Sequence, residues 1–292
     1  MKRPARAAPV APAVLFAGQA YDPAAAAWVI AWQRPTGLAL VRRNGADAAL
    51  PGRAPALGGR TLAWLEGEQA VIADALSGAV RARLAAPGAR VLGVSDELLA
   101  WRAQDADGRD AIHTRTLGAE PGPPRLLAAA PGRAELGRPT VLGGQVLFHV
   151  AGIGGSRIVL ADPATGEQQI LRRDPGAQLS NPSSDGVRLL HVHATGRQQE
   201  LRLGPIVESD GADLVIAIHP SSGRRDRESE PGRARHVHPY MHPLPPIAKA
   251  GETQTLWSTA LAPEGAYVTR IVARAGRARR ADILRVALPF GG

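Results

Sequence analysis

Short apolar runs with alternating polar positions recur along most of this chain, separated by turns rich in Gly, Asp and Pro. One run has a repeated frame: a large aliphatic residue, then Ala, then Trp, as in "IAW" and twice "LAW". Two later copies carry His in the Trp position, and a sixth, weaker copy is "GAYVTRI", with Tyr267 and Thr269 at the alternating places. The marker residues of the first five copies are Trp32, Trp64, Trp101, His149 and His191. A period of about 40 residues predicts a repeat architecture.

The segments on either side of each copy are also repeated. A turn with Gly or Asp precedes the marker run, as in "LGGRTLAW" and "VSDELLAW", and a further alternating run follows it, as in "AVIAD" and "AIHTR". Turns of this composition join antiparallel strands. The apolar stretches that precede the turns lie at residues 55–57, 91–94, 140–142, 179–181 and 256–260. Each unit is therefore predicted to contain about four short antiparallel strands.

The marker strands are apolar on both faces. Side chains alternate along a strand, so Leu62 and Trp64 point to one side of the sheet and Ala63 points to the other. A sheet that is apolar on both sides must be covered on both, and radial stacking of four-stranded sheets achieves this while protecting the edges. The sequence therefore predicts an all-β fold, a six-bladed β-propeller of four-stranded antiparallel blades, as a single domain over residues 1–292.

The N-terminal segment has two interpretations. Three basic residues among the first six precede apolar residues, as in a secretory signal peptide, but two prolines interrupt the apolar run. We therefore interpret residues 14–17 as the inner strand of the first blade, ahead of a "YDP" turn, and residues 1–12 as a disordered tail. A closing strand shared between the two termini is also expected, and the sequence leaves open which blade it completes.

The sixth copy is delayed by an insertion between repeats five and six, from about residue 204 to residue 251. Within it, "DLVIAIHP" predicts a buried strand at residues 213–220. Residues 221–249 mix charges of both signs with five prolines, which predicts an extended surface loop. Long loops on rigid scaffolds are frequent binding elements. The residues of this loop that we expect to contact a partner are Arg224, Arg225, Arg233, Arg235 and Tyr240.

The same loop is a candidate metal centre. Its "HVHPYMH" stretch places His236, His238 and His242 within seven positions, and His219 lies upstream. Imidazole nitrogens suit zinc and copper, but a metal site also needs a rigid frame that orients its ligands. A solvated loop is therefore the favoured interpretation. The alternative is a metal-binding protein or a metal-dependent hydrolase that uses these three histidines.

Other candidate chemistry has a structural explanation. His149 and His191 stand in a packing position of the repeat, so a role in the core or between blades is expected. His191 and His193 share one face of a strand with no carboxylate beside them in sequence, and the acidic turn at residues 105–110 lacks the Glu that completes a calcium loop. There is no nucleophile elbow either. The sequence therefore predicts no catalytic residues and no cofactor.

The net charge of +9 raises nucleic acid as a partner. All but two of the 35 basic residues are arginines, and they are scattered over nearly every segment rather than gathered in a groove with aromatic residues. We therefore expect no specific nucleic-acid binding. The chain has no Cys, which excludes disulfides and thiolate chemistry, and it has no apolar run long enough for a transmembrane helix.

Two segments carry a family resemblance. "LSNPSSDGVRLLHVHATGRQQELRLG", residues 179–204, resembles a blade of the TolB-like propeller repeats, in which a Pro-containing strand leads through an Asp-Gly turn into an apolar strand. "WSTALAPEGAYVTRIV", residues 257–272, is a weaker match. The resemblance implies a six-bladed propeller that binds other macromolecules, often outside the cytoplasm in bacterial cell envelopes, and it brings no catalytic residues. The leading hypothesis is a non-enzymatic scaffold whose partner is another protein, with the oligomeric state left open.

Overall fold

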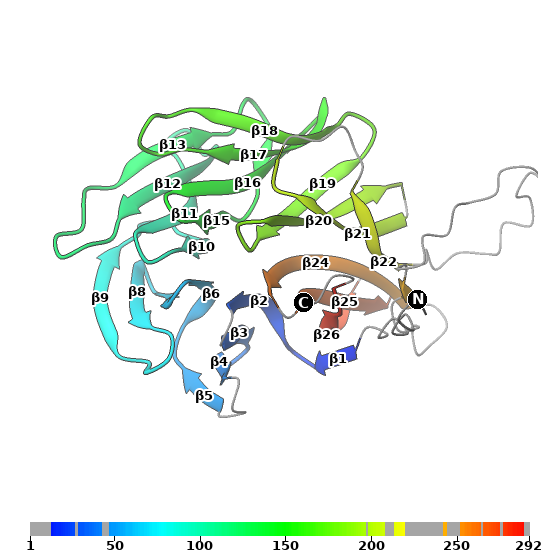
Figure 1. Cartoon of the computed structure of the whole chain (residues 1–292), viewed down its shortest axis with the longest axis horizontal. Helices are drawn as coiled ribbons and strands as arrows, with labels where there is room; N and C mark the ends of the chain where they lie inside the picture. The colour runs from blue at the N-terminus through cyan, green and yellow to red at the C-terminus, as the bar shows by residue number, and fades with distance from the viewer. Residues whose placement is uncertain are drawn as a thin grey trace, which may run out of the picture.

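Six antiparallel sheets surround a central axis in the computed structural model. The structure describes residues 13–26, 29–42, 47–196, 198–207, 213–219, 242–243, 252–263, 265–274 and 277–288. Figure 1 shows the sheets following one another around the ring in chain order, from blue through green to red. We number the sheets as blades 1 to 6 in that order.

Each blade begins at the axis and proceeds outwards. Blade 1 contains β2 (Tyr21–Ala26), β3 (Val29–Arg34), β4 (Gly37–Arg42) and β5 (Asp47–Leu50), and blade 2 contains β6 (Arg53–Gly58), β7 (Thr61–Glu66), β8 (Gln69–Asp74) and β9 (Val80–Ala85). Blade 3 contains β10 (Val91–Val94), β11 (Leu98–Gln104), β12 (Asp110–Thr116) and β13 (Arg125–Ala129).

The second half of the ring follows the same plan with three variations. In blade 4 the inner strand is divided into β14 (Glu135–Leu136) and β15 (Thr140–Leu142), followed by β16 (Gln145–Gly152), β17 (Gly155–Ala161) and β18 (Gln168–Asp174). Blade 5 contains β19 (Gln178–Ser184), β20 (Arg188–Thr195), β21 (Gln198–Pro205) and β22 (Leu214–His219), with β23 (His242–Pro243) added in parallel. Blade 6 contains β24 (Glu252–Ala262), β25 (Gly265–Arg274), β26 (Arg277–Val286) and β1 (Ala13–Phe16).

The predicted fold class and blade number are confirmed. All six copies of the marker run form the second strand of a blade, and the predicted apolar stretches before the turns lie in the inner strands. The side chains of Trp32, Trp64 and Trp101 are at most 2% exposed, as their place in the repeat requires.

The hydrophobic core is divided among the spaces between blades. Each of six apolar clusters joins two neighbouring sheets. For example, Trp64 packs with Leu40 of blade 1, whereas Ala63 on the opposite face packs with Leu92 and Trp101 of blade 3. A strand with two apolar faces is therefore covered on both sides. The sheets also approach closely, because a Cβ at Gly58 would lie 1.9 Å from the carbonyl oxygen of Val94.

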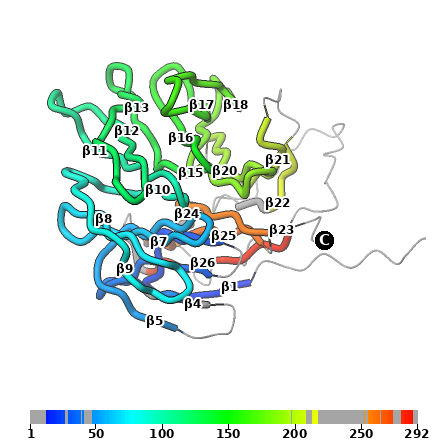
Figure 2. The backbone as a smooth tube through the Cα atoms, turned by 60° about the vertical axis from the view of Figure 1, so that its left-hand side comes forward, coloured from blue at the N-terminus to red at the C-terminus, as the bar shows by residue number. Residues whose placement is uncertain are grey.

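The N-terminal strand closes the ring. β1 pairs with β26, with Ala13 opposite Arg285, and so it is the outer strand of blade 6. Figure 2 shows this blue strand beside the red one. The expected closing strand is thus confirmed and completes blade 6. The interpretation of residues 14–17 as the inner strand of blade 1 is wrong: that place is taken by β2, whose sequence includes the predicted "YDP" turn.

Irregular inner strands explain this error. Asp22, Ala54 and Asn181 have positive φ angles of 47°, 54° and 50°, each directly precedes a proline, and each lies in a bulge of its inner strand. Proline has no N–H to donate to a ladder, so it is accepted at a sheet edge or in a bulge. The inner strands are such edges, which is why an Asp-Pro pair there belongs to a strand.

The extra sequence between repeats five and six begins later than predicted. The predicted buried strand is present as β22, and Ile216 in it is 1% exposed. This strand pairs with β21 and is therefore the fourth strand of blade 5, so the insertion starts after it. Of the predicted loop at residues 221–249, only residues 242–243 belong to the described part of the chain, as β23. The predicted tail at residues 1–12 lies outside the described residues.

The contribution of β1 to the closed ring can be tested by mutation. The Phe16 ring stacks on Trp32 of blade 1 with 3.6 Å between centroids, so β1 also packs against the neighbouring blade. Phe16→Ala is expected to lower the free energy of unfolding by about 1.5–3 kcal/mol, less than for a fully buried Phe because this ring is partly exposed. Denaturant titration measures the change. Leu15→Ala is the control, because its side chain is 40% exposed, and an equal loss in both variants would contradict the role of the stack.

Candidate functional site

A cavity of about 550 Å³ lies where the inner strands of all six blades converge. Its wall is formed by the last residues of these strands and the turns that follow them, so it opens on one face of the ring. Cavities of this size accommodate small molecules or short peptide segments. One wall residue from each blade in turn is Ala25, Leu57, Val94, Leu142, Ser183 and Ala260.

The cavity wall is built mostly from small and aliphatic residues, with few charges. Among the described residues that line it, only Arg138 and Asp185 are ionic. The Asp185 carboxylate is already paired with Arg188 at 2.5 Å. Its charge is therefore largely neutralised within its own hairpin, which leaves Arg138 as the unusual group.

Arg138 sits in the break between β14 and β15. The neighbouring Gly137 permits the break, because a Cβ there would lie 1.9 Å from Nδ1 of His149. From blade 4, Arg138 reaches across its neighbours: Nε donates to the carbonyl oxygen of Leu92 in blade 3 at 3.3 Å, and Nη2 donates to that of Pro55 in blade 2. Nη1 is buried and has no hydrogen-bond partner among the described residues. Burial lowers the pKa of Arg138, and the nearby Asp22 charge opposes this.

The opposite side of the ring is held by hydroxyl groups. Thr259 of blade 6 donates to the carbonyl oxygen of Asn181 in blade 5 at 2.5 Å, and its Oγ1 also lies 3.0 Å from Oγ of Ser183. Thr140 of blade 4 donates to the carbonyl oxygen of Pro182 at 3.0 Å. The bulged inner strand of blade 5 thus offers its carbonyl groups to both neighbours. These contacts fix the shape of the cavity wall.

Removal of one hydroxyl tests this arrangement. Thr259→Val keeps the side-chain volume but leaves the partly buried carbonyl of Asn181 without this donor, so we expect a loss of about 1–2 kcal/mol in the free energy of unfolding. The exposed turn residue Thr36 provides the control substitution, Thr36→Val, with an expected change within about 0.5 kcal/mol. Equal stability of the two variants in denaturant titrations would show that the hydroxyl bridge is unimportant.

His149 also joins two blades. Its Nδ1 accepts a hydrogen bond from the backbone N–H of Asn181 at 3.1 Å, and the side chain is buried. This requires an unprotonated Nδ1. Burial, and secondarily the positive charge of Arg102, lowers the pKa of His149 to about 4. The predicted role of this histidine between blades is confirmed.

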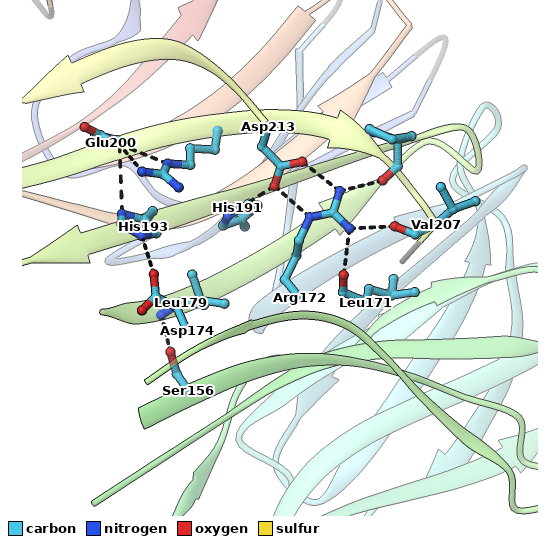
Figure 3. Close-up of polar contacts among 12 residues, drawn as sticks. Ser156, Leu171, Arg172, Asp174, Leu179, His191, His193, Glu200, Val207 and Asp213 are labelled. Atoms are coloured by element: carbon cyan, nitrogen blue, oxygen red, sulfur yellow. Dashed lines mark hydrogen bonds and ion pairs between the residues drawn. The ribbon is translucent and has the colours of Figure 1, made fainter. Parts of the chain in front are cut away.

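A second polar cluster joins blades 4 and 5 away from the cavity (Figure 3). The guanidinium of Arg172 makes two hydrogen bonds to Asp213, at 2.8 Å from Nε and 2.7 Å from Nη2. The remaining donors bind the carbonyl oxygens of Leu171, Pro205 and Val207. All five N–H groups are thereby used. The two side chains are 4% and 3% exposed, so this is a fully buried ion pair.

The paired histidines of β20 flank this ion pair. His191 Nε2 lies 3.8 Å from Asp213, and burial lowers the pKa of His191 to about 3. His193 Nε2 lies 3.0 Å from Asp174, and its Nδ1 lies 3.9 Å from Glu200. Sequence reasoning found no carboxylate beside these histidines. The structure brings three from other strands and loops, of which Glu200 stands directly opposite His193 in the hairpin register. That register was the signal available in the sequence.

The residues predicted to bind a partner or a metal lie almost entirely outside the described residues. This applies to Arg224, Arg225, Arg233, Arg235, Tyr240, His236 and His238. His242 is in β23, opposite Ala217 of β22. Within the described ranges, no group of three or more His, Asp and Glu side chains could hold a metal ion.

The acidic turn that resembles a calcium loop has a structural role. Asp105 accepts hydrogen bonds from the backbone N–H groups of Asp107 and Arg109, at 3.0 and 2.9 Å, within its own hairpin. These hydrogen bonds, led by that from Arg109, lower the pKa of the Asp105 carboxyl. The carboxylate is therefore used to stabilise the turn, as an ordinary hairpin tip requires.

Comparison with known proteins gives structural matches only. No protein-family model and no curated protein matches the sequence. TolB from Acinetobacter baumannii superposes with a TM-score of 0.50 and 12% identity over 95% of this chain, and the match covers 64% of the TolB chain. The chain has a TolB-like six-bladed propeller fold. The β-propeller domain of the Trilobed protease from Pyrococcus furiosus superposes on this TolB-like propeller with a TM-score of 0.52. The match has 11% identity and covers 94% of this chain and 86% of that chain.

A further match to the TolB-like propeller is Pyrococcus horikoshii acylaminoacyl peptidase, with a TM-score of 0.51 and 12% identity over 93% of this chain and 46% of that chain. The chain thus spans less than two thirds of the TolB chain and less than half of the peptidase. At these identities the likeness establishes the fold alone. In the described part of the chain, no helix is long and apolar enough to cross a membrane.

Proposed function

We propose that this TolB-like propeller is a non-enzymatic module that binds a segment of another protein in its central cavity. The observation that carries the proposal is the cavity itself, to which all six blades contribute and whose wall is fixed by hydrogen bonds between blades. A pre-formed wall binds without the cost of ordering its own side chains. The resemblance to TolB-like repeats supports a location in the bacterial cell envelope.

Site-specific photo-crosslinking in the source cells tests this function. A photoreactive amino acid replaces Leu142, which lines the cavity, and in a matched control variant it replaces Leu126, which is 59% exposed on the outer strand β13. We expect one discrete protein adduct from position 142 and none from position 126. Equal adducts at both positions, or no adduct at position 142, would contradict binding in the cavity.

The alternative, a metal-binding protein or metal-dependent hydrolase, depends on His236, His238 and His242, of which only His242 lies within the described residues. Metal analysis of the purified, untagged protein distinguishes the two functions. Stoichiometric zinc or copper that is lost in His238→Ala would favour the alternative. A metal-free protein that forms the adduct at position 142 would favour the scaffold.

A further inference from the structure

Arg172 and Arg270, the two buried arginines of the described chain, each have a carboxylate partner, whereas Arg138, whose Nη1 is buried, has none. Arg172 pairs with Asp213 and Arg270 pairs with Asp282, each at 2.7 Å. Arg138 instead binds two carbonyl oxygens, and among the described residues it forms no ion pair within 4 Å. A buried charge without a counter-charge is costly. Such a group beside a cavity is a candidate for binding a ligand of opposite charge.

The electrostatics of the cavity follow from this difference. Asp185, the other ionic residue of the wall, is neutralised by Arg188. Asp22 acts on Arg138 only through space. The rest of the described wall is formed by aliphatic side chains, hydroxyl groups, the amide of Gln145 and backbone. The one wall charge without an ion-pair partner among the described residues is therefore positive, and in such surroundings a charge interacts more strongly than it does in water.

We propose that the cavity binds a carboxylate of an acidic peptide segment, with Arg138 as its counter-charge. This rests on the proposed function and specifies its ligand. Arg138 lines the cavity, and its guanidinium is held there by the carbonyl oxygens of two other blades. Its Nη1 is also the one nitrogen of the guanidinium that has no acceptor among the described residues.

The surroundings favour a peptide carboxylate over a phosphate. Phosphate sites gather several cations or a row of backbone N–H groups around three acceptor oxygens. Here a single guanidinium already uses Nε and Nη2 for Leu92 and Pro55. The wall next to it, with Ala24, Ala56 and Leu57, suits small side chains and an extended backbone. A single guanidinium, with Nη1 as its one unpaired nitrogen among the described residues, and an apolar wall match one carboxylate on a segment that is otherwise small and apolar.

Binding of two matched peptides to the full chain tests the proposal. The probes are fluorescent pentapeptides, acetyl-Ala-Ala-Glu-Ala-Ala-amide and the same peptide with Gln in place of Glu, with affinities measured by anisotropy. We expect the Glu peptide to bind at least about tenfold more tightly than the Gln peptide, because a charge-assisted hydrogen bond replaces a neutral one. In Arg138→Gln this preference is expected to disappear.

Arg138 also bridges three blades, so Arg138→Gln can impair folding as well as binding, and a second pair of variants keeps the test decisive. Ser184 lines the cavity and Thr165 lies in an outer turn, and each hydroxyl accepts from the backbone N–H two residues later, at 3.0 and 3.2 Å. Asp accepts the same hydrogen bond. Ser184→Asp should therefore weaken binding of the Glu peptide by at least about tenfold, whereas Thr165→Asp should leave it unchanged.

The outcomes separate this inference from the proposed function. Equal binding of the two peptides, weakened in both cases by Ser184→Asp, would overturn the role of the carboxylate and leave peptide binding in the cavity intact. Binding of neither peptide would also overturn the inference, while the adduct from position 142 still decides the function. If inorganic phosphate alone stabilises the protein against heat in an Arg138-dependent way and the Glu peptide does not, the site is one for free anions and the inference is wrong.

Discussion

Asp213→Asn is expected to lower the free energy of unfolding by about 3–5 kcal/mol. The substitution keeps the shape of the side chain but removes the only carboxylate that faces the Arg172 guanidinium within 4 Å among the described residues. Arg172 is 4% exposed and cannot recover hydration, so its charge remains buried without a counter-charge. Gly204 adds to the constraint, because a Cβ there would lie 1.8 Å from Asp213 Oδ1. The contact is therefore closely fitted and has no room for a substitute partner.

Denaturant titration of this variant has a matched control in Asp107→Asn. Asp107 also pairs with an arginine, Arg109, at 2.9 Å, but its side chain is 72% exposed, and an exposed pair contributes about 1 kcal/mol or less. Similar losses in the two variants would contradict the importance of burial. The double substitution Arg172→Met with Asp213→Leu is expected to be less destabilising than Asp213→Asn alone, because it removes both charges.

Acidification from pH 6.5 to about 4 is expected to destabilise the protein through His149 and His191. Both are neutral in the folded state, since burial lowers their pKa values to about 4 and about 3. In the unfolded chain their pKa is the ordinary value of 6.5. The unfolded state therefore binds more protons below pH 6.5. Their contribution is fully present above that pH and is lost as the pH falls, by about 1.4 kcal/mol per pH unit for each histidine.

Carboxylates begin to titrate at the acidic end of this range, so the histidine effect is isolated by a variant rather than by the pH window alone. A hydrogen bond from His193 is the main cause that lowers the pKa of Asp174 below its ordinary 3.8, so the stability that Asp174 contributes is lost as the pH falls from about 5 through its lowered pKa. Denaturant titrations at several pH values between 7 and 4 give the slope. His149→Gln should reduce the slope of unfolding free energy against pH by the contribution of one histidine, about 1.4 kcal/mol per pH unit. An unchanged slope in that variant would show that His149 is not the titrating group.

The repeat pattern was sufficient to predict the propeller because the fold places the same demand on every blade. A marker strand such as that of Trp64 must be apolar on both faces, and this requirement is visible in a single sequence. The inner strand of blade 1 was missed for the opposite reason. Its Asp22-Pro23 pair has the composition of a turn, and only the position of β2 at the channel, where a missing N–H is harmless, makes it a strand.

The polar sites could be predicted only in part. The pairing of His193 with Glu200 follows from the register of one hairpin, which the sequence implies. The contact of Arg172 with Asp213 joins different blades, and no local pattern marks it. The contacts of Arg138 are even harder to predict from the sequence. It is one of many scattered arginines in the sequence, and its role depends on the break at Gly137 and on carbonyl groups from two other blades.

Closure of the ring by β1 has a consequence for synthesis. Ala13 pairs with Arg285, so β1 has no pairing partner until β26 has been synthesised. A nascent chain that stops before β26 leaves blade 6 incomplete and two strand edges exposed, which is the condition under which strands pair with other chains. Contacts that span nearly the whole sequence also form slowly, because a long loop must be closed first. Locking of the ring is therefore expected to be the late, chaperone-sensitive step of folding.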